Sequence, residues 1–566
     1  MAQRFQPLSG PATNRLPLPA AGLVMLGIVS VGLGSLAALI HEASDLHIAQ
    51  LWQEPYLLAI LTFSLWQATL STLISLGLGM LVAVALARRP RFPGRGLLLR
   101  IMEMSLVIPS LLALFGLVAV HGRQGWVAPL IEAMPFSSRN APGYLYGLSG
   151  IVLAHVFFNL PLSARIMLQA VERAPGTHWR LVAQFGLSRW AIWQVLEWPA
   201  IKPLLPRLAA LVFTLCFTSF AIVMTLGGGP GSSTLEVALY QALKYDNDLA
   251  LAALLALTQL TICLALWGMA LASGANASLL QGGSEHSAGQ LRGAQRRDAR
   301  GWRRLGDGVT LSALVLLLVP PLVAIVIAGL AGVPQIVADG TVWAAARRSL
   351  LMASCAGIGA VSLALLLLAG TGVLRNAGRR GLAAVMEGSG QLILVLPALV
   401  LGTGLFVLLR PALGGAMQAY ALVVLVNALM ALPFSMQVLR SGAVELAAPQ
   451  RRLADQLGIH GWSRLRWLFW PRLRRPMALS LAYAMTLSLG DFSVIALFGS
   501  PASPTLPMLL YQQLGGYRWQ SAAATALMLL ALIVLIFALL SALTLRLPRY
   551  SWKRSGRLPT VSRPQC

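Results

Sequence analysis

The hydrophobic and polar positions of this chain form long apolar stretches separated by short polar segments, many of them rich in arginine. A helix needs about 20 apolar residues to cross the roughly 30 Å of hydrocarbon in a bilayer. Because a helix satisfies its own backbone hydrogen bonds within lipid, we expect an all-α polytopic membrane protein. The twelve expected spans are 20–40, 56–87, 97–120, 144–168, 205–226, 249–271, 309–330, 343–374, 382–409, 419–439, 476–498 and 521–545.

The composition agrees with a chain that lies mostly in lipid. Of its 566 residues 57% are hydrophobic and 11% are charged, whereas soluble proteins carry roughly 25% charged residues. The net charge is +25, and the basic residues cluster between spans, as the positive-inside rule predicts for cytoplasmic loops. This distribution favours a lipid bilayer, and not nucleic acid, as the partner. It also predicts that both termini are cytoplasmic.

One polar loop occurs twice in the chain. Residues 452–471 repeat residues 180–199 at an offset of 272, with identical residues at eight of the twenty positions. Each half holds six spans, and an even number gives the two copies the same orientation in the membrane. We therefore expect two parallel six-helix repeats. The predicted organisation is a first repeat at 1–272, a cytoplasmic linker at 273–308, a second repeat at 309–546 and a basic cytoplasmic tail at 547–566.

The duplication extends beyond this loop. Upstream of it, prolines and glycines recur at an offset of 288, and downstream of it aromatic residues recur at offsets of 272 and 271. The shorter offset downstream reflects a one-residue gap. The matched pairs include Pro109 with Pro397, Gly116 with Gly404, Phe220 with Phe492, and Tyr240 with Tyr511.

Each copy of the loop keeps a fixed spacing between a glycine and a proline. Gly186 and Gly458 can end one helix and turn the chain. Residues 187–196 mix Trp and Leu with polar residues, which predicts a short amphipathic helix. Such a helix could lie on the lipid surface, held there by Trp190 and the arginines. The constant spacing favours the other interpretation, in which the helix docks into a groove on a partner protein.

The loop resembles the EAA signature of ABC-importer membrane subunits, E-A-A-x3-G-x9-I-x-L-P. Gly186 and Gly458 match its glycine, whereas Arg180 and Arg452 stand where the signature has Glu. In that family the loop forms the coupling helix, which seats in a separate ATPase subunit. The resemblance implies ATPase-coupling roles for Arg180, Gly186, Trp190, Leu196, Pro199, Arg452, Gly458, Trp462, Leu468 and Pro471.

Four further segments narrow the resemblance. Residues 121–126, 154–172, 226–248 and 490–499 are similar to the fused permeases of bacterial thiamine (thiamine pyrophosphate) importers. This implies the type I ABC-importer permease fold in the inner membrane, with two copies of an ABC ATPase subunit and a periplasmic substrate-binding protein. The substrate would be thiamine or its phosphate esters. The alternatives are a ferric-iron importer permease, a secondary transporter that works without an ATPase, and a membrane scaffold that transports nothing.

The sequence lacks the residues that would bind ATP on this chain. It has no GxxxxGK[ST] motif, and its lysines, Lys202, Lys244 and Lys553, follow no glycine-rich loop. The sequence shows no cluster of Cys, His and carboxylate residues, so it predicts neither a metal site nor a set of catalytic residues. We therefore expect a permease and not an enzyme, with no cofactor on this chain and with ATP hydrolysed on a separate subunit.

Asp491 is the acid that the pattern places deepest in a span. A carboxylate within the membrane is costly and indicates a functional role by default. It could attract a cationic substrate, with Phe220 and Phe492 beside the pathway. The interpretation that we favour is that Asp491 pairs internally or caps a helix break at Gly490.

The remaining acids divide between the two sides of the membrane. Glu103 and Glu387 lie near the cytoplasmic ends of their spans and predict internal polar contacts. On the outer side we expect a short surface helix at 234–245, followed by Asp246 and Asp248. The residues expected to meet a periplasmic binding protein are Glu236, Tyr240, Asp246 and Asp248, together with 505–511.

Overall fold

The computed structural model describes residues 17–43, 54–105, 107–132, 141–174, 176–273, 302–334, 339–409, 416–444, 457–459, 463 and 465–545, and every regular element among them is helical. The long helices of the first half are α1 (Pro17–Glu42), α3 (Pro55–Arg88), α7 (Leu148–Glu172), α11 (Leu205–Phe217) and α14 (Leu249–Ala272). Its shorter ones are α4 (Arg95–Met104), α5 (Ser110–His121), α6 (Ala128–Glu132), α8 (Gly176–Gln184), α9 (Arg189–Ile192), η3 (Trp193–Glu197), α10 (Trp198–Ile201), η4 (Lys202–Leu204), α12 (Phe220–Leu226) and α13 (Leu235–Lys244).

The second half follows the same plan. Its long helices are α15 (Trp302–Ala331), α17 (Gly340–Asn376), α20 (Ala416–Val444), α23 (Trp470–Gly490) and α26 (Trp519–Leu545). The shorter ones are α18 (Arg380–Gln391), η7 (Leu392–Val395), α19 (Ala398–Leu409), η9 (Leu465–Phe469), α24 (Ser493–Phe498) and α25 (Leu506–Gly515).

The described helices accommodate the twelve expected spans. Among the described residues of both halves, nine helical stretches are long and apolar enough to cross a membrane. Two shorter apolar helices, α5 and α19, and the arginine-bearing α23 occupy the positions of the other three. The prediction of an all-α polytopic fold is confirmed.

Four of the expected spans, 97–120, 205–226, 382–409 and 476–498, are each divided between two helices, and only the break near Gly490 was anticipated from the sequence. In each half the third span divides before a proline, as α4 and α5, and as α18 and α19. Pro109 and Pro397 lack the N–H that a continuous helix would need, and each directly precedes the next helix. The fifth span of each half divides at Thr218–Ser219 and at Asp491–Phe492.

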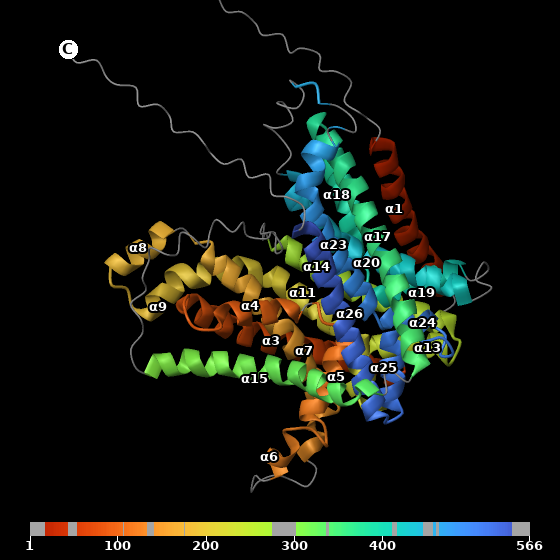
Figure 1. The fold of residues 1–566 in the computed structure, drawn as a ribbon, viewed down its shortest axis with the longest axis horizontal. Coiled ribbons are helices and arrows are strands. Elements are labelled where there is room, and N and C mark those ends of the chain that lie inside the picture. Colours follow the sequence, from red (N-terminus) through yellow and green to blue (C-terminus); the bar gives the residue numbers. More distant parts are fainter. Residues whose placement is uncertain are drawn as a thin grey trace, which may run out of the picture.

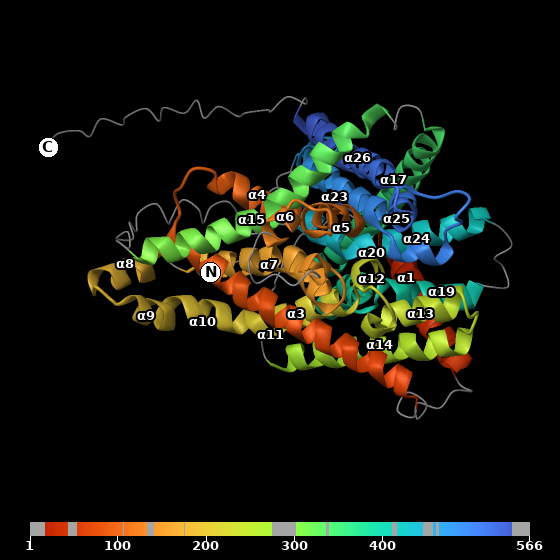
Figure 2. The same cartoon turned by 90° about the horizontal axis from the view of Figure 1, so that it is seen from below.

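The two halves diverge from a shared meeting region. In Figure 1, α3 and α15 run to the left, whereas α17 and α18 run to the top. Figure 2 shows α12, α13, α24 and α25 close together where the two groups of helices meet. The first repeated loop, around α8 and α9, lies at the far left end of its group in Figure 1. The repeated loop of the first half is therefore remote from the meeting region.

The first helix of each half packs on the other half. α1 lies against α17 and α19, and α15 lies against α5 and α3. The glycines matched by the repeat mark these crossings, because an added Cβ on Gly116 would lie 2.5 Å from the Pro321 carbonyl oxygen of α15. A Cβ on Gly404 would lie 2.6 Å from the Ser35 carbonyl oxygen of α1. We call this arrangement, in which the first helix of each half packs on the other half, the exchange of α1 and α15. It explains why both halves keep glycine at the crossing position.

Adding one methyl group at these crossings is expected to destabilise the fold. Gly116→Ala or Gly404→Ala should each cost about 1–3 kcal/mol, the usual penalty for overpacking a close contact. Gly77→Ala in α3 is the matched control, because an added Cβ there meets nothing within 4 Å. Thermal unfolding of the purified proteins in the same detergent measures the difference. Equal stability of Gly116→Ala and Gly77→Ala would contradict the close approach of α15.

Candidate coupling loops and pathway

The first repeated loop is built from two helical segments joined by a left-handed glycine. α8 ends at Gln184, and Gly186 follows with a φ of 59°. Few residues other than glycine adopt this conformation, and it commonly ends a helix. The Ser188 hydroxyl then accepts a hydrogen bond from the Ala191 N–H at 3.3 Å and starts α9. The predicted helix-ending role of Gly186 agrees with this geometry.

The helix that follows is not the separate short one expected at 187–196. It runs on from α9 through η3, a π-helical turn, and through α10 into α11. Pro199 cannot donate to the carbonyl of Val195, and a wider turn relieves the clash that a proline causes in an α-helix. The separate helix of this loop is α8, which lies before the glycine and carries Arg180.

Several apolar side chains of this loop face outward. Phe185 is 75% exposed, Trp190 66% and Val195 64%. Leu196 is buried and Pro199 is exposed. Exposed apolar side chains beside a polar helix mark a contact with a partner or with lipid.

The second loop repeats the features of the first where the structure describes it. Gly458 has a φ of 65°. The π-helical turn η9 lies at the same offset of 272 from η3, and it contains Leu468. Pro471 lies in the first turn of α23. Arg452 and Trp462 lie outside the described residues.

A buried ion-pair network joins the first loop to two other helices. Glu197, at the end of η3, is 0% exposed and lies 3.2 Å from the Arg88 guanidinium at the end of α3. Asp307 of α15 lies 3.9 Å from Arg88 and 3.5 Å from Arg89. The second loop carries Phe469 at the position of Glu197. The network was not predicted from the sequence, although Glu197 stands as a single acid in a loop that otherwise carries arginines.

The two acids that were predicted to lie near the cytoplasm and to make internal contacts, Glu103 and Glu387, are both paired. Glu103 accepts from Arg165, and Glu387 accepts from Arg375. Arg440 also lies 2.7 Å from Glu387. These pairs tie the broken third spans to neighbouring long helices.

Aromatic rings from both halves stack where the halves meet. Phe220 and Phe492 have ring centroids 5.5 Å apart and an interplanar angle of 21°. Tyr240 lies 5.0 Å from Phe220, and Tyr511 lies 4.8 Å from Phe492. The structure therefore brings together two of the predicted pathway residues.

The third predicted pathway residue caps a helix beside these rings. Asp491 Oδ1 accepts a hydrogen bond from the Val494 N–H at 3.4 Å, at the start of α24. Its second oxygen, Oδ2, is buried and has no hydrogen-bond partner among the described residues. The favoured interpretation, a cap at the break after Gly490, matches this geometry. A role toward substrate stays a prediction.

The helix expected on the outer surface is mostly buried. In α13, Glu236 is 2% and Tyr240 is 5% exposed, and Glu236 accepts from the Gln259 amide at 2.9 Å. α13 packs under α14, so the prediction of a surface helix at 234–245 is wrong. Its apolar residues outnumber its polar ones, which favours burial over exposure. Asp246 and Asp248 are exposed as expected, whereas residues 505–510, also expected on the binding-protein surface, are buried at the start of α25.

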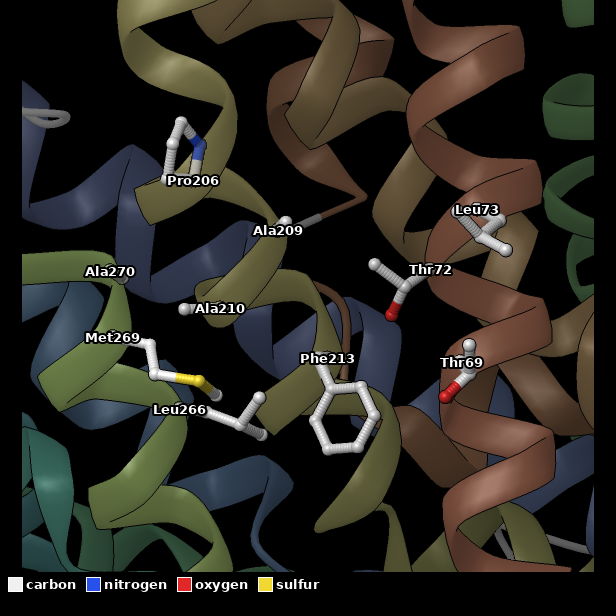
Figure 3. A pocket seen from close by; sticks show the side chains of 10 residues that line it. All are labelled: Thr69, Thr72, Leu73, Pro206, Ala209, Ala210, Phe213, Leu266, Met269 and Ala270. Carbon is white, nitrogen blue, oxygen red and sulfur yellow. The ribbon is translucent and has the colours of Figure 1, made fainter. Parts of the chain in front are cut away.

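A cavity of about 260 Å³ opens on the outside of the first half (Figure 3). Its walls come from α3, α11 and α14 only, so it does not lie between the halves. Tyr483 and Phe537 of the second half contact each other at 5.5 Å, at positions that correspond to the smaller Leu211 and Leu266. Of these two leucines, Leu266 lines the cavity, at the position where the second half has the larger Phe537. Its lining residues are Thr69, Thr72, Leu73, Pro206, Ala209, Ala210, Phe213, Leu266, Met269 and Ala270.

A family model described as "Binding-protein-dependent transport system inner membrane component" matches residues 75–274. These residues contain most of the first six-helix repeat and the whole first loop. With the all-helical fold and the exchanged helices, the match defines the class of the protein as an inner-membrane transport permease.

Relatives of named function match almost the whole chain. The thiamine transport system permease protein of Escherichia coli is 42% identical over 94% of this chain and 98% of its own length. The protein of the same name from Brucella abortus is 38% identical over 92% of this chain and 94% of its own. That of Haemophilus influenzae is 35% identical over 92% and 95%. The chain belongs to this family of thiamine transport system permeases, and the resemblance found in its motifs is confirmed.

Proposed function

We propose that the chain is the membrane-spanning permease of an ATP-driven importer that carries thiamine or its phosphate esters across the bacterial inner membrane. The observation that supports this most strongly is the similarity to thiamine permeases, which extends through both halves and over 92–94% of the chain. The ATP would be hydrolysed on a separate subunit, and this chain would hold no cofactor.

Two ATPase subunits would bind, one at each repeated loop. The two loops share a left-handed glycine and a π-helical turn at the same offset of 272. Similar geometry supports similar partners, and the apolar side chains exposed on the first loop supply a docking surface. The arginine-rich segments support a cytoplasmic position for both loops, for the 273–308 linker and for both termini.

The way in which the halves are joined supports a transport cycle in which they tilt against each other. The halves meet at α12, α13, α24 and α25 and diverge away from there (Figure 2). With the loops in the cytoplasm, the proposed pathway would be closed at the meeting region and would open toward the cytoplasm. ATP binding would draw the two ATPases together, and the loops would tilt the halves until the pathway opens outward. Substrate would then arrive from a periplasmic binding protein, whose contacts we propose at the exposed Asp246 and Asp248.

Complementation tests the proposed substrate. A bacterium that cannot make thiamine and lacks its own thiamine permease should grow on low external thiamine when this chain is expressed with its ATPase and binding protein. Omitting the ATPase should abolish growth, because the chain has no motor of its own. Growth without the ATPase would favour a secondary transporter. Rescue of an iron-uptake strain, and not of the thiamine strain, would favour a ferric-iron permease.

A further inference from the structure

The aromatic rings between the halves sit at equivalent positions of the duplicated chain. Phe220 begins α12, just after the break in the fifth span of the first half, and Phe492 is the last residue of the corresponding break before α24. Tyr240 and Tyr511 also correspond through the repeat. The order of contacts is Tyr240, Phe220, Phe492, Tyr511, so each half contributes two consecutive rings. The local two-fold axis of the duplication therefore passes between the two phenylalanines.

These four rings, which we call the aromatic column, lie where the two halves are in contact. Phe220 is 1% and Phe492 is 2% exposed. At the same level, Lys244 Nζ of α13 donates to the Leu497 carbonyl oxygen of α24 at 3.3 Å. An added Cβ on Gly490 would lie 2.7 Å from Cγ of Pro109, which belongs to the other half. A solute that moves between the halves must therefore part these rings.

The chemistry of the column suits a flat cation. The faces of aromatic rings attract cations, and the attraction strengthens in a desolvated site. Asp491, next to Phe492 in the chain, adds a buried carboxylate oxygen without a hydrogen-bond partner among the described residues. A carboxylate with one oxygen buried in this way is stabilised by a nearby positive charge. The thiazolium of thiamine is a flat ring with a permanent positive charge.

We propose that Phe220 and Phe492, flanked by Tyr240 and Tyr511, form the gate of the pathway and that their parted faces, with the Asp491 carboxylate, bind the cationic aromatic ring of the substrate. This inference rests on the proposed function for the identity of the substrate. The position of the gate depends only on the geometry.

Uptake into vesicles that contain the full complex of permease, ATPase and binding protein tests the binding surface. Phe220→Leu/Phe492→Leu keeps an apolar seal but removes both ring faces, so kcat/KM for thiamine should fall about tenfold. Asp491→Asn, which keeps the capping oxygen, should lower it several-fold. An uncharged thiamine analogue, with carbon in place of the positive ring nitrogen, should be carried by wild type and variants at similar rates. The binding protein is the same in every experiment, so its own preference between thiamine and the analogue cancels when variants are compared with wild type.

The control pair is Phe213 and Phe217, which stack at 5.5 Å within α11 and away from the interface. Phe213→Leu/Phe217→Leu should leave the preference for thiamine over the analogue as in wild type, and Phe220→Tyr/Phe492→Tyr should retain it. Wild-type kinetics in Phe220→Leu/Phe492→Leu, or an equal loss for thiamine and analogue, would overturn the cation site.

Passive leak tests the gate independently of the substrate. Without ATP, vesicles with Phe220→Ala/Phe492→Ala should leak tetramethylammonium, whereas wild type and Phe213→Ala/Phe217→Ala should stay tight. A tight Phe220→Ala/Phe492→Ala variant would overturn the gate. If the Phe220→Ala/Phe492→Ala vesicles leak but wild-type vesicles take up no thiamine with ATP, the proposed substrate is overturned and the gate stays in place.

Discussion

The double variant Gly186→Val/Gly458→Val is expected to lose most of the ATPase stimulation that substrate-loaded binding protein produces, while it still inserts in the membrane. Both glycines have a φ near +60°. That conformation costs an L-residue roughly 1–2 kcal/mol, and a β-branched one more. An added Cβ meets nothing within 4 Å at either glycine, so the effect would come from the backbone turn alone. We expect at least a tenfold fall in stimulated ATP hydrolysis by the reconstituted complex.

The matched control at these positions is Gly186→Asn/Gly458→Asn. Asn tolerates the left-handed conformation better than other residues do, so this variant should keep most of the stimulation. Gly268→Val in α14 controls for added bulk, because its Cβ also meets nothing within 4 Å and no positive φ is required there. Full stimulation in the double valine variant would show that the left-handed turns are not needed for coupling.

Removing Arg88 from the buried network should strongly destabilise the first half. Arg88→Met leaves the carboxylate of Glu197, which is 0% exposed, without the guanidinium 3.2 Å away. Breaking a buried ion pair by removing one partner costs about 3–5 kcal/mol, because the other charge stays buried. The thermal midpoint of the complex should fall. If the first repeated loop couples to the ATPase as proposed, ATP hydrolysis should also uncouple from transport, because Glu197 lies in that loop.

A double-mutant cycle separates the ion pair from other effects of the substitution. Arg88→Met/Glu197→Gln removes both charges and should recover much of the lost stability. Arg91→Met is the control for loss of a nearby arginine, because Arg91 is exposed three residues further along. If Arg88→Met melted like Arg91→Met, the network would contribute nothing to stability.

The sequence predicted the features that depend on local chemistry and on comparison of the two halves. Long apolar runs predicted the helices, and the glycine-to-proline spacing predicted the turns at Gly186 and Gly458. The repeat also singled out Gly116 with Gly404 and Phe220 with Phe492. Both pairs prove to lie at contacts between the halves.

The features that were missed depend on neighbours that are distant in the chain. The exchange of α1 and α15 between halves leaves no mark on hydropathy, because a helix is equally apolar whichever half it packs on. The network of Glu197, Arg88 and Asp307 joins three segments, and no local pattern links them. The break at Thr218–Ser219 occurs within an apolar run that a window of about 20 residues reads as continuous.

The most direct test of the central claim is uptake of labelled thiamine by vesicles that contain the chain and its ATPase, with ATP trapped inside and the binding protein outside. We predict that thiamine accumulates only when ATP, the ATPase and the binding protein are all present, and that collapsing ion gradients with ionophores has no effect. Accumulation driven by an ion gradient without ATP, or no accumulation with all components present and active, would contradict the account.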